Sequence, residues 1–214
     1  MLSRVFVVLC LSGATWSCSG SGAPSDPGPL VDNTRWVRSE KGEEFFGARP
    51  EGSDCELTPI DCEDELPLSE GECANFEDNS PCVVAFVPEC LDTFTVLAVY
   101  TRMLDDRESL CDWITLEQPS LRAIRAGDQV EVRTFHAPLT APVPGVARIG
   151  FVIGDEQVLD YSVAIPSEPV FPKAPPWTAA KDYPAGTPLL FHVDNHGQNE
   201  YMLIEASILP SPSE

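Results

Sequence analysis

The sequence predicts an all-β fold, an antiparallel β-sandwich or jelly roll with a disulfide-stapled, acidic, loop-rich N-terminal portion. Roughly eight short apolar runs recur after residue 83, separated by Pro, Gly, Asp and Asn, which is typical of strands joined by turns. No stretch has a long helical period, and the one helical candidate, residues 102–112, is short. Six cysteines lie from residue 55 to residue 111, where apolar side chains are scarce, so disulfides would replace the missing core.

Residues 1–17 have the composition of a secretory signal peptide. Arg4 precedes an apolar run at residues 5–11, and small residues follow. The run is too short to cross a membrane as a helix, so we expect it to act as an export signal.

Cys18 follows this segment directly and precedes residues 19–22, Ser-Gly-Ser-Gly. These residues resemble the end of a bacterial lipoprotein signal, in which the cysteine becomes the acylated first residue of the mature protein. The resemblance covers residues 1–22. It implies that Cys18 carries a lipid and that the protein is exported to the bacterial cell envelope, lipid-anchored or periplasmic/extracellular. Ordinary cleavage after Ala14 or Ala23 is the alternative.

Composition divides the chain into four parts. After the signal peptide (1–17) we expect a lipid-anchored flexible tether (18–50), because its beginning is rich in Gly, Ser and Pro and it has no sustained apolar period. An acidic cysteine-rich segment (51–92) follows, and a β-sandwich domain (93–210) comes last.

The acidic segment cannot build a core of its own. Residues 50–101 contain 13 acidic side chains and no Lys or Arg. Calcium takes oxygen ligands, so the acidic run at residues 61–65 suits a calcium-binding loop; a solvated loop pinned by disulfides is the alternative. In an oxidising compartment the six remaining cysteines imply up to three disulfides of undetermined connectivity, among Cys55, Cys62, Cys73, Cys82, Cys90 and Cys111.

The strands are expected in the second half of the chain. Two turns, 125–128 (Arg-Ala-Gly-Asp) and 183–187 (Tyr-Pro-Ala-Gly-Thr), lead into the two strands that carry histidines. Residues 154–156 should form a hairpin turn between two strands with apolar faces. The expected strands are 83–87, 93–100, 113–116, 129–135, 147–153, 158–165 and two more within 188–208.

Residues 188–208 are expected to form a hairpin around a tight turn. The expected register sets the apolar face of one strand opposite the apolar face of the other, because side chains two apart share a face. Phe191 and Val193 should then be buried, and Phe191→Ala should threaten folding. The facing pairs are Val193 with Met202, Phe191 with Ile204 and Leu189 with Ala206. The opposite face carries a mixed set, namely His192, Asp194, Tyr201, Leu203 and Glu205.

The charge of the chain disfavours some partners. The sequence has 13 basic and 34 acidic residues, a net charge of −21, and loss of Arg4 with the signal peptide makes it more negative. Nucleic acid is disfavoured because it needs a basic surface, and we expect membrane contact through the lipid anchor only. A cation, a glycan or a basic protein is a compatible partner.

One pattern has the character of a metal site. His192, Asp194 and His196 alternate along one strand, and His136 ends another. Alternate residues share a strand face about 6.6 Å apart, so imidazole and carboxylate groups can converge on zinc or copper. In the alternative, these are ordinary polar residues of an outer face, and His192→Ala barely affects stability.

No catalytic residue is identified, because the sequence has no nucleophile elbow, zinc-protease motif or phosphate-binding loop. Four aromatic residues form either a sugar-stacking platform or part of the core: Trp113, Trp177, Tyr183 and Tyr201. We therefore expect a non-enzymatic surface lipoprotein that acts as a binding or structural module. The alternative is a metal-dependent enzyme or metal-binding protein that uses the histidine hairpin. The compatible cofactor is a divalent ion, zinc, copper or calcium.

Overall fold

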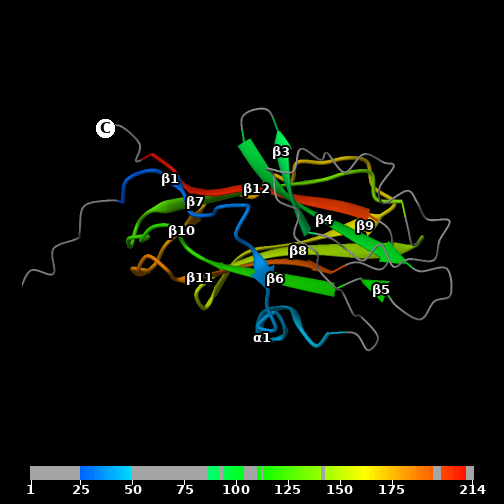
Figure 1. The fold of residues 1–214 in the computed structure, drawn as a ribbon, viewed down its shortest axis with the longest axis horizontal. Helices are drawn as coiled ribbons and strands as arrows, with labels where there is room; N and C mark the ends of the chain where they lie inside the picture. Colours follow the sequence, from blue (N-terminus) through cyan, green and yellow to red (C-terminus); the bar gives the residue numbers. More distant parts are fainter. Residues whose placement is uncertain are drawn as a thin grey trace, which may run out of the picture.

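Two antiparallel sheets pack face to face (Figure 1), which confirms the predicted β-sandwich. The structure is a computed structural model that describes residues 25–49, 86–91, 94–103, 110–111, 113–140, 143–194 and 199–210. Sheet A contains, in spatial order, β10 (Trp177–Thr178), β7 (Gln129–His136), β12 (Asn199–Ile208), β4 (Phe94–Met103) and β3 (Phe86–Leu91), with β1 (Gly28–Pro29) beside β12 and β5 (Leu110–Cys111) beside β4. Sheet B contains β2 (Val37–Arg38), β6 (Trp113–Pro119), β11 (Pro188–Asp194), β8 (Gly145–Ile153) and β9 (Glu156–Ile165).

The short helix α1 (Glu43–Phe46) lies against the outer face of sheet B (Figure 1). It is the only helix among the described residues. The helical candidate at residues 102–112 is wrong where the structure describes it, because Arg102 of β4 pairs with Cys111 of β5. Local apolar spacing in so short a segment did not distinguish helix from strand.

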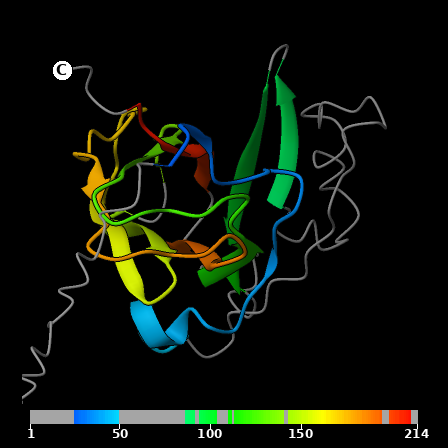
Figure 2. The same ribbon diagram turned by 90° about the vertical axis from the view of Figure 1, so that its left-hand side faces the viewer.

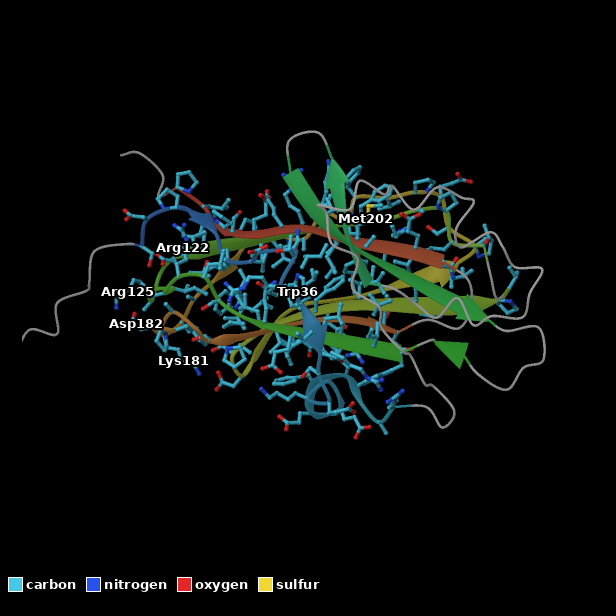
Figure 3. The ribbon with its side chains drawn as sticks, viewed as in Figure 1. Trp36, Arg122, Arg125, Lys181, Asp182 and Met202 are labelled. Carbon is cyan, nitrogen blue, oxygen red and sulfur yellow. The ribbon has the colours of Figure 1, made fainter. Side chains whose placement is uncertain are left out.

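Alternate strand residues fill the space between the sheets. In β11, Leu189, Phe191 and Val193 are at most 1% exposed, so the predicted burial of Phe191 and Val193 is confirmed. Trp36 lies at the centre of this core (Figure 3), with its ring 6.3 Å from that of Phe151 and 6.4 Å from that of Phe191. Burying one such side chain stabilises the fold by roughly 1.5–3 kcal/mol.

A bent ladder joins the two sheets at one end (Figures 1 and 2). β6 pairs with β11 in sheet B, and β7 pairs with β10 in sheet A. Between these pairs, Ile124 and Tyr183 exchange two backbone hydrogen bonds of 2.8 Å. The register does not shift across the bend, so residues 113–130 and 177–194 form one antiparallel ladder that passes between the sheets. We name its connecting loops, residues 120–128 and 179–187, the arch.

The two turns expected in the arch are confirmed. Gly127 and Gly186 have φ values of 93° and 86°, a left-handed conformation that favours glycine. Asp128 accepts a hydrogen bond of 2.7 Å from the backbone N–H of Arg125, and the Thr187 hydroxyl donates one of 2.7 Å to a carbonyl of its own turn. Each turn is therefore closed by the polar residue that follows its glycine.

The expected C-terminal hairpin is wrong. β11 lies in sheet B between β6 and β8, whereas β12 lies in sheet A between β7 and β4. Tyr201 and Leu203 face the core from β12, and Met202 and Ile204 do not. The error has a physical cause: β11 is buried on both faces, since Leu190 is 1% exposed and other outer-face residues are covered too. As a central strand, β11 has both edges paired, with β6 and β8, which leaves no edge for β12.

β12 also contains an irregularity that sequence periodicity does not predict. Its pairing with β7 shifts between Leu203 and Glu205. The side-chain amide of Asn33 donates hydrogen bonds to the carbonyls of Leu203 (3.3 Å) and Ile204 (2.9 Å), and its oxygen accepts one from the Trp36 indole (3.1 Å). Asn33 thereby bonds the backbone at the point where the register shifts, and Ile204, which has no residue opposite it in either ladder, gains a partner.

The flexible tether expected at residues 18–50 is too long. β1 pairs with β12 and β2 pairs with β6, and Leu30 and Val31 are buried in the core. The sandwich also begins before residue 93, because β3 pairs with β4. The Pro- and Gly-rich composition concealed these contacts, since each strand contributes only two residues to a sheet.

The signal peptide and Cys18 lie outside the described residues, as do Cys55, Cys62, Cys73 and Cys82. Cys90 and Cys111 belong to β3 and β5. Lipidation and disulfide formation therefore stay predictions. No helix in the described part of the chain is long and apolar enough to cross a membrane.

Candidate functional site

His192 lies on the outer face of sheet B, beneath α1. Its ring stacks on Phe46 with centroids 4.1 Å apart, and the Trp113 ring meets it edge-on at 4.9 Å. Nδ1 of His192 lies 2.9 Å from the hydroxyl of Thr115. Burial, together with the nearby Arg148 charge, lowers the pKa of His192 to about 3, so the ring is neutral at pH 7.

Glycine makes this close packing feasible. A Cβ atom at Gly150 would overlap the ring of Phe46, and one at Gly42 would overlap the side chain of Thr115. Arg148 fixes the same layer by donating a hydrogen bond of 2.8 Å to the Phe46 carbonyl. His192 is thus a packed structural residue of this layer.

His136 occupies a different place. It is fully buried at the end of β7, opposite Tyr201 in the ladder with β12, and so faces the space between the sheets. Its Nδ1 lies 2.9 Å from the carbonyl of Ala137. His136 faces inward from sheet A and His192 faces outward from sheet B, so these two imidazoles cannot share one ion.

This geometry removes part of the expected metal site. Asp194 ends β11, next to the layer that contains His192, and His196 lies outside the described residues. Within the described ranges, no group of three or more His, Cys, Asp or Glu side chains is placed to hold a metal ion. A site that takes both His136 and His192 as ligands is therefore incorrect.

The expected aromatic platform does not form as a set. Trp113 and Tyr183 are each 4% exposed and Tyr201 is fully buried, so these three rings belong to packed layers. Only Trp177 of the four is half-buried and reaches the surface. Its ring packs against that of Tyr183 with centroids 5.8 Å apart, which fixes one edge of the indole.

Trp177 borders a groove of about 580 Å³ on the side of the sandwich. β9 and β10 are edge strands of sheets B and A, and the groove lies between β9 and the segment that leads into β10. We name it the side groove; it is lined by residues 158–161 and 172–178, which include Tyr161, Pro172, Pro175, Pro176 and Trp177.

Tyr161 gives the side groove a rigid floor. Its hydroxyl lies 3.0 Å from that of Thr134, so it links β9 to β7 across the sandwich. Burial raises the pKa of Tyr161 to about 12, so the phenol stays protonated at neutral pH and can donate in this bond. On the outer side of β9, Arg148 holds Asp160 with bonds of 2.7 and 2.9 Å, which lower the pKa of the carboxyl.

Two other hollows are less distinctive. One, of about 580 Å³, lies beside the Arg133–Glu205 ion pair, and the other, of about 470 Å³, lies beside Arg148 and Asp194. Neither is lined by an aromatic side chain.

The sequence did contain a signal for the side groove, because Pro175, Pro176 and Trp177 are consecutive. The prolines, however, indicated only a connection between strands.

Comparisons with known proteins identify no family for the chain. No protein-family model matches the sequence, and no curated protein matches it either. Among solved structures, one described as "CBM4 structure and function" aligns over 54% of this chain and 79% of its own, with 17% identity and a TM-score of 0.31. A CBM61 protein in complex with beta-1,4-galactotriose aligns over 55% and 72%, with 9% identity and a TM-score of 0.29. Likenesses this remote do not indicate what this chain binds.

Proposed function

We propose that this protein is a non-enzymatic, exported and lipid-anchored binding module, and that the side groove binds a neutral glycan. The observation that carries the proposal is the half-buried indole of Trp177 at an open groove with proline rings and Tyr161 as its other walls. Export and the anchor rest on the signal-like residues 1–22 and on Cys18.

The chemistry of the side groove suits a ligand with flat apolar faces and many hydroxyl groups. Trp177 and the prolines offer flat apolar surfaces, and the negative face of an aromatic ring attracts the C–H groups of a sugar. Thr178 and Lys173 are exposed at the groove and supply hydrogen-bonding groups. Lys173 and Asp160 are the only charged lining residues, and Asp160 is paired with Arg148. The net charge of −21 disfavours an acidic glycan, so a neutral one is favoured.

The metal-dependent enzyme has less support. It needs histidines that converge, and His136 and His192 face away from each other on different sheets. The low pKa of His192 also comes from burial under Phe46, which leaves the imidazole no open side for a substrate.

The proposal is tested by titrating the mature protein with a panel of neutral oligosaccharides, using calorimetry and tryptophan fluorescence. We expect Trp177→Ala to weaken binding at least about tenfold, equivalent to about 1.4 kcal/mol. Thr178→Ala tests the groove without disturbing the core, because Thr178 is exposed. Phe171→Ala is the matched control, since Phe171 is 60% exposed and does not line the groove.

Two results would contradict the proposal. One is glycan binding that Trp177→Ala and Thr178→Ala leave unchanged while both variants remain folded. The other is binding of an extended peptide, through the free edge of β9, with no binding of any oligosaccharide in the panel.

A further inference from the structure

We propose that the arch is the face that this protein presents to the membrane, so that the sandwich stands with its length directed away from the lipid surface. The partner is the headgroup layer of a phospholipid bilayer. The inference rests on the lipid anchor in the proposed function, and it adds the orientation of the folded body. Three observations carry it: where the chain enters the fold, how far it reaches, and how charge is distributed.

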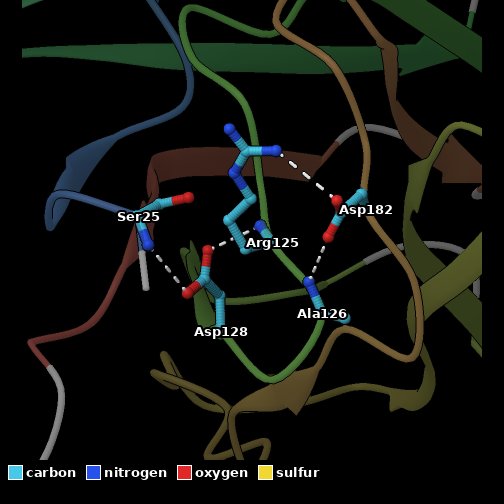
Figure 4. A network of polar contacts seen from close by, with 5 residues as sticks. All are labelled: Ser25, Arg125, Ala126, Asp128 and Asp182. Carbon is cyan, nitrogen blue, oxygen red and sulfur yellow. Dashed lines mark hydrogen bonds and ion pairs between the residues drawn. The ribbon is translucent and has the colours of Figure 1, made fainter. Parts of the chain in front are cut away.

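The chain enters the fold at the arch. The backbone N–H of Ser25 donates a hydrogen bond of 3.2 Å to Asp128 (Figure 4), a residue of the first arch loop. Arg122, in the same loop, donates to the carbonyls of Asp26 and Pro27 at 3.1 Å and to that of Pro29 at 3.0 Å. These contacts fix the first described residues against the arch.

The connection to the anchor is short. Ser25 follows Cys18 by seven residues. Seven extended residues span at most about 25 Å, and a flexible chain of that length has a root-mean-square span of about 15 Å. Gly28 pairs with Ile208, and Asn199 lies at the other end of the ten-residue β12, about 30 Å away. The arch end therefore stays within about 25 Å of the lipid, whereas the opposite end can be more than about 50 Å away.

Charge favours the same orientation. The arch loops contain three basic residues, Arg122, Arg125 and Lys181, and two acidic residues, Asp128 and Asp182, a net charge of +1 in a chain of −21. Both acids accept hydrogen bonds from the arch itself (Figure 4). Asp155 and Glu156, from the β8–β9 turn, lie beside Lys181, and Asp26 lies beside Arg122, so three basic and five acidic residues give this end a net charge of −2, a small share of the −21 of the chain.

An anionic bilayer therefore repels the arch less than it repels the rest of the body. The cations and Asp182 gather at one end of the molecule, as Figure 3 shows. The loop tips carry small exposed residues, among them Ala126 and Ala185, which allow close approach to headgroups.

The experiment uses the full-length, lipidated protein in vesicles of phosphatidylcholine and phosphatidylglycerol that carry a nitroxide on the headgroup. Ala126→Trp places a fluorescent reporter at the tip of the arch. Val146→Trp is the matched control, since Val146 is 55% exposed. It lies at the start of β8, whereas the other end of β8, at Ile153, pairs with Leu189 next to the arch. The native tryptophans are common to both variants and are subtracted.

We expect the vesicles to quench the added tryptophan of Ala126→Trp and to leave that of Val146→Trp unchanged. Flotation of the vesicles reports the anchor separately. Flotation with equal quenching of both reporters, or with stronger quenching of Val146→Trp, would overturn the orientation and leave the anchor standing. Failure to float would remove the anchor, and the orientation with it.

Discussion

His192 makes the stability of the fold depend on pH. Burial between Phe46 and Trp113 lowers the pKa of His192 to about 3, compared with about 6.5 in an unfolded chain. Below pH 6.5 the unfolded chain therefore binds a proton that the folded chain does not, and protonation favours unfolding. The stabilisation by neutral His192 is fully present above pH 6.5 and is lost as the pH falls toward 3.

The magnitude follows from the same two values. Each pH unit below 6.5 costs about 1.4 kcal/mol while His192 stays neutral in the fold, so a change from pH 7 to pH 5 removes about 2 kcal/mol. Since small domains are stable by only about 5–15 kcal/mol, this loss is measurable. His192→Gln removes the titration while keeping a polar group near Thr115.

The assay is urea unfolding of the wild type and His192→Gln at both pH values. Both proteins share the titration of their carboxylates, so the difference between their losses isolates His192. We expect the wild type to lose about 2 kcal/mol more than the variant between pH 7 and pH 5. Equal losses, or a His192 ring signal that titrates near pH 6.5 in NMR spectra, would show that the ring is not buried as described.

Three further predictions concern packing, the arch and the cysteines. Phe191→Ala should destabilise the fold by about 3–5 kcal/mol, measured by urea unfolding, because it leaves a cavity beside Trp36. Asp128→Ala should cost about 1–3 kcal/mol, since it leaves the N–H groups of Ser25 and Arg125 without this acceptor; a change below 0.5 kcal/mol, within the usual surface range, would contradict that role. Thiol labelling of the unreduced exported protein should find no reactive group among Cys55, Cys62, Cys73, Cys82, Cys90 and Cys111; two or more reactive thiols would refute full pairing.

The strands were predictable because each alternates apolar residues over a length that fits a sandwich. β8 and β9 are the clearest case, since Gly154 and Asp155 separate two such runs and the structure pairs them as a hairpin. Burial of Phe191 followed from the same alternation, independently of which strand lies beside it. Alternation assigned the face correctly for β11 but not for β12, where Tyr201 and Leu203 face the core in place of Met202 and Ile204.

The environment of the outer faces was not predictable in this way. His192 shares its strand face with Asp194 and points outward, and both facts favoured an exposed residue whose loss is tolerated. The structure covers it with Phe46, from a segment more than a hundred residues earlier that appeared to be part of a tether. Removal of His192 should therefore cost more than the sequence suggested, because it leaves a gap beneath a packed ring. The cover that Phe46 provides over His192 is a tertiary contact, which strand periodicity does not predict.

The arch shows how a signal can be present in the sequence and still be missed. Its two loops share little beyond the Ala-Gly pair of each turn, so they do not resemble a repeat. Their structural positions nevertheless correspond: Ile124 and Tyr183 bridge each other, and Asp128 and Thr187 close the turns. The shared pattern is a buried residue, a glycine turn, a short polar side chain and a core strand. Because both loops bend at the same place, one register continues from the β6–β11 pair through Ile124 and Tyr183 to the β7–β10 pair.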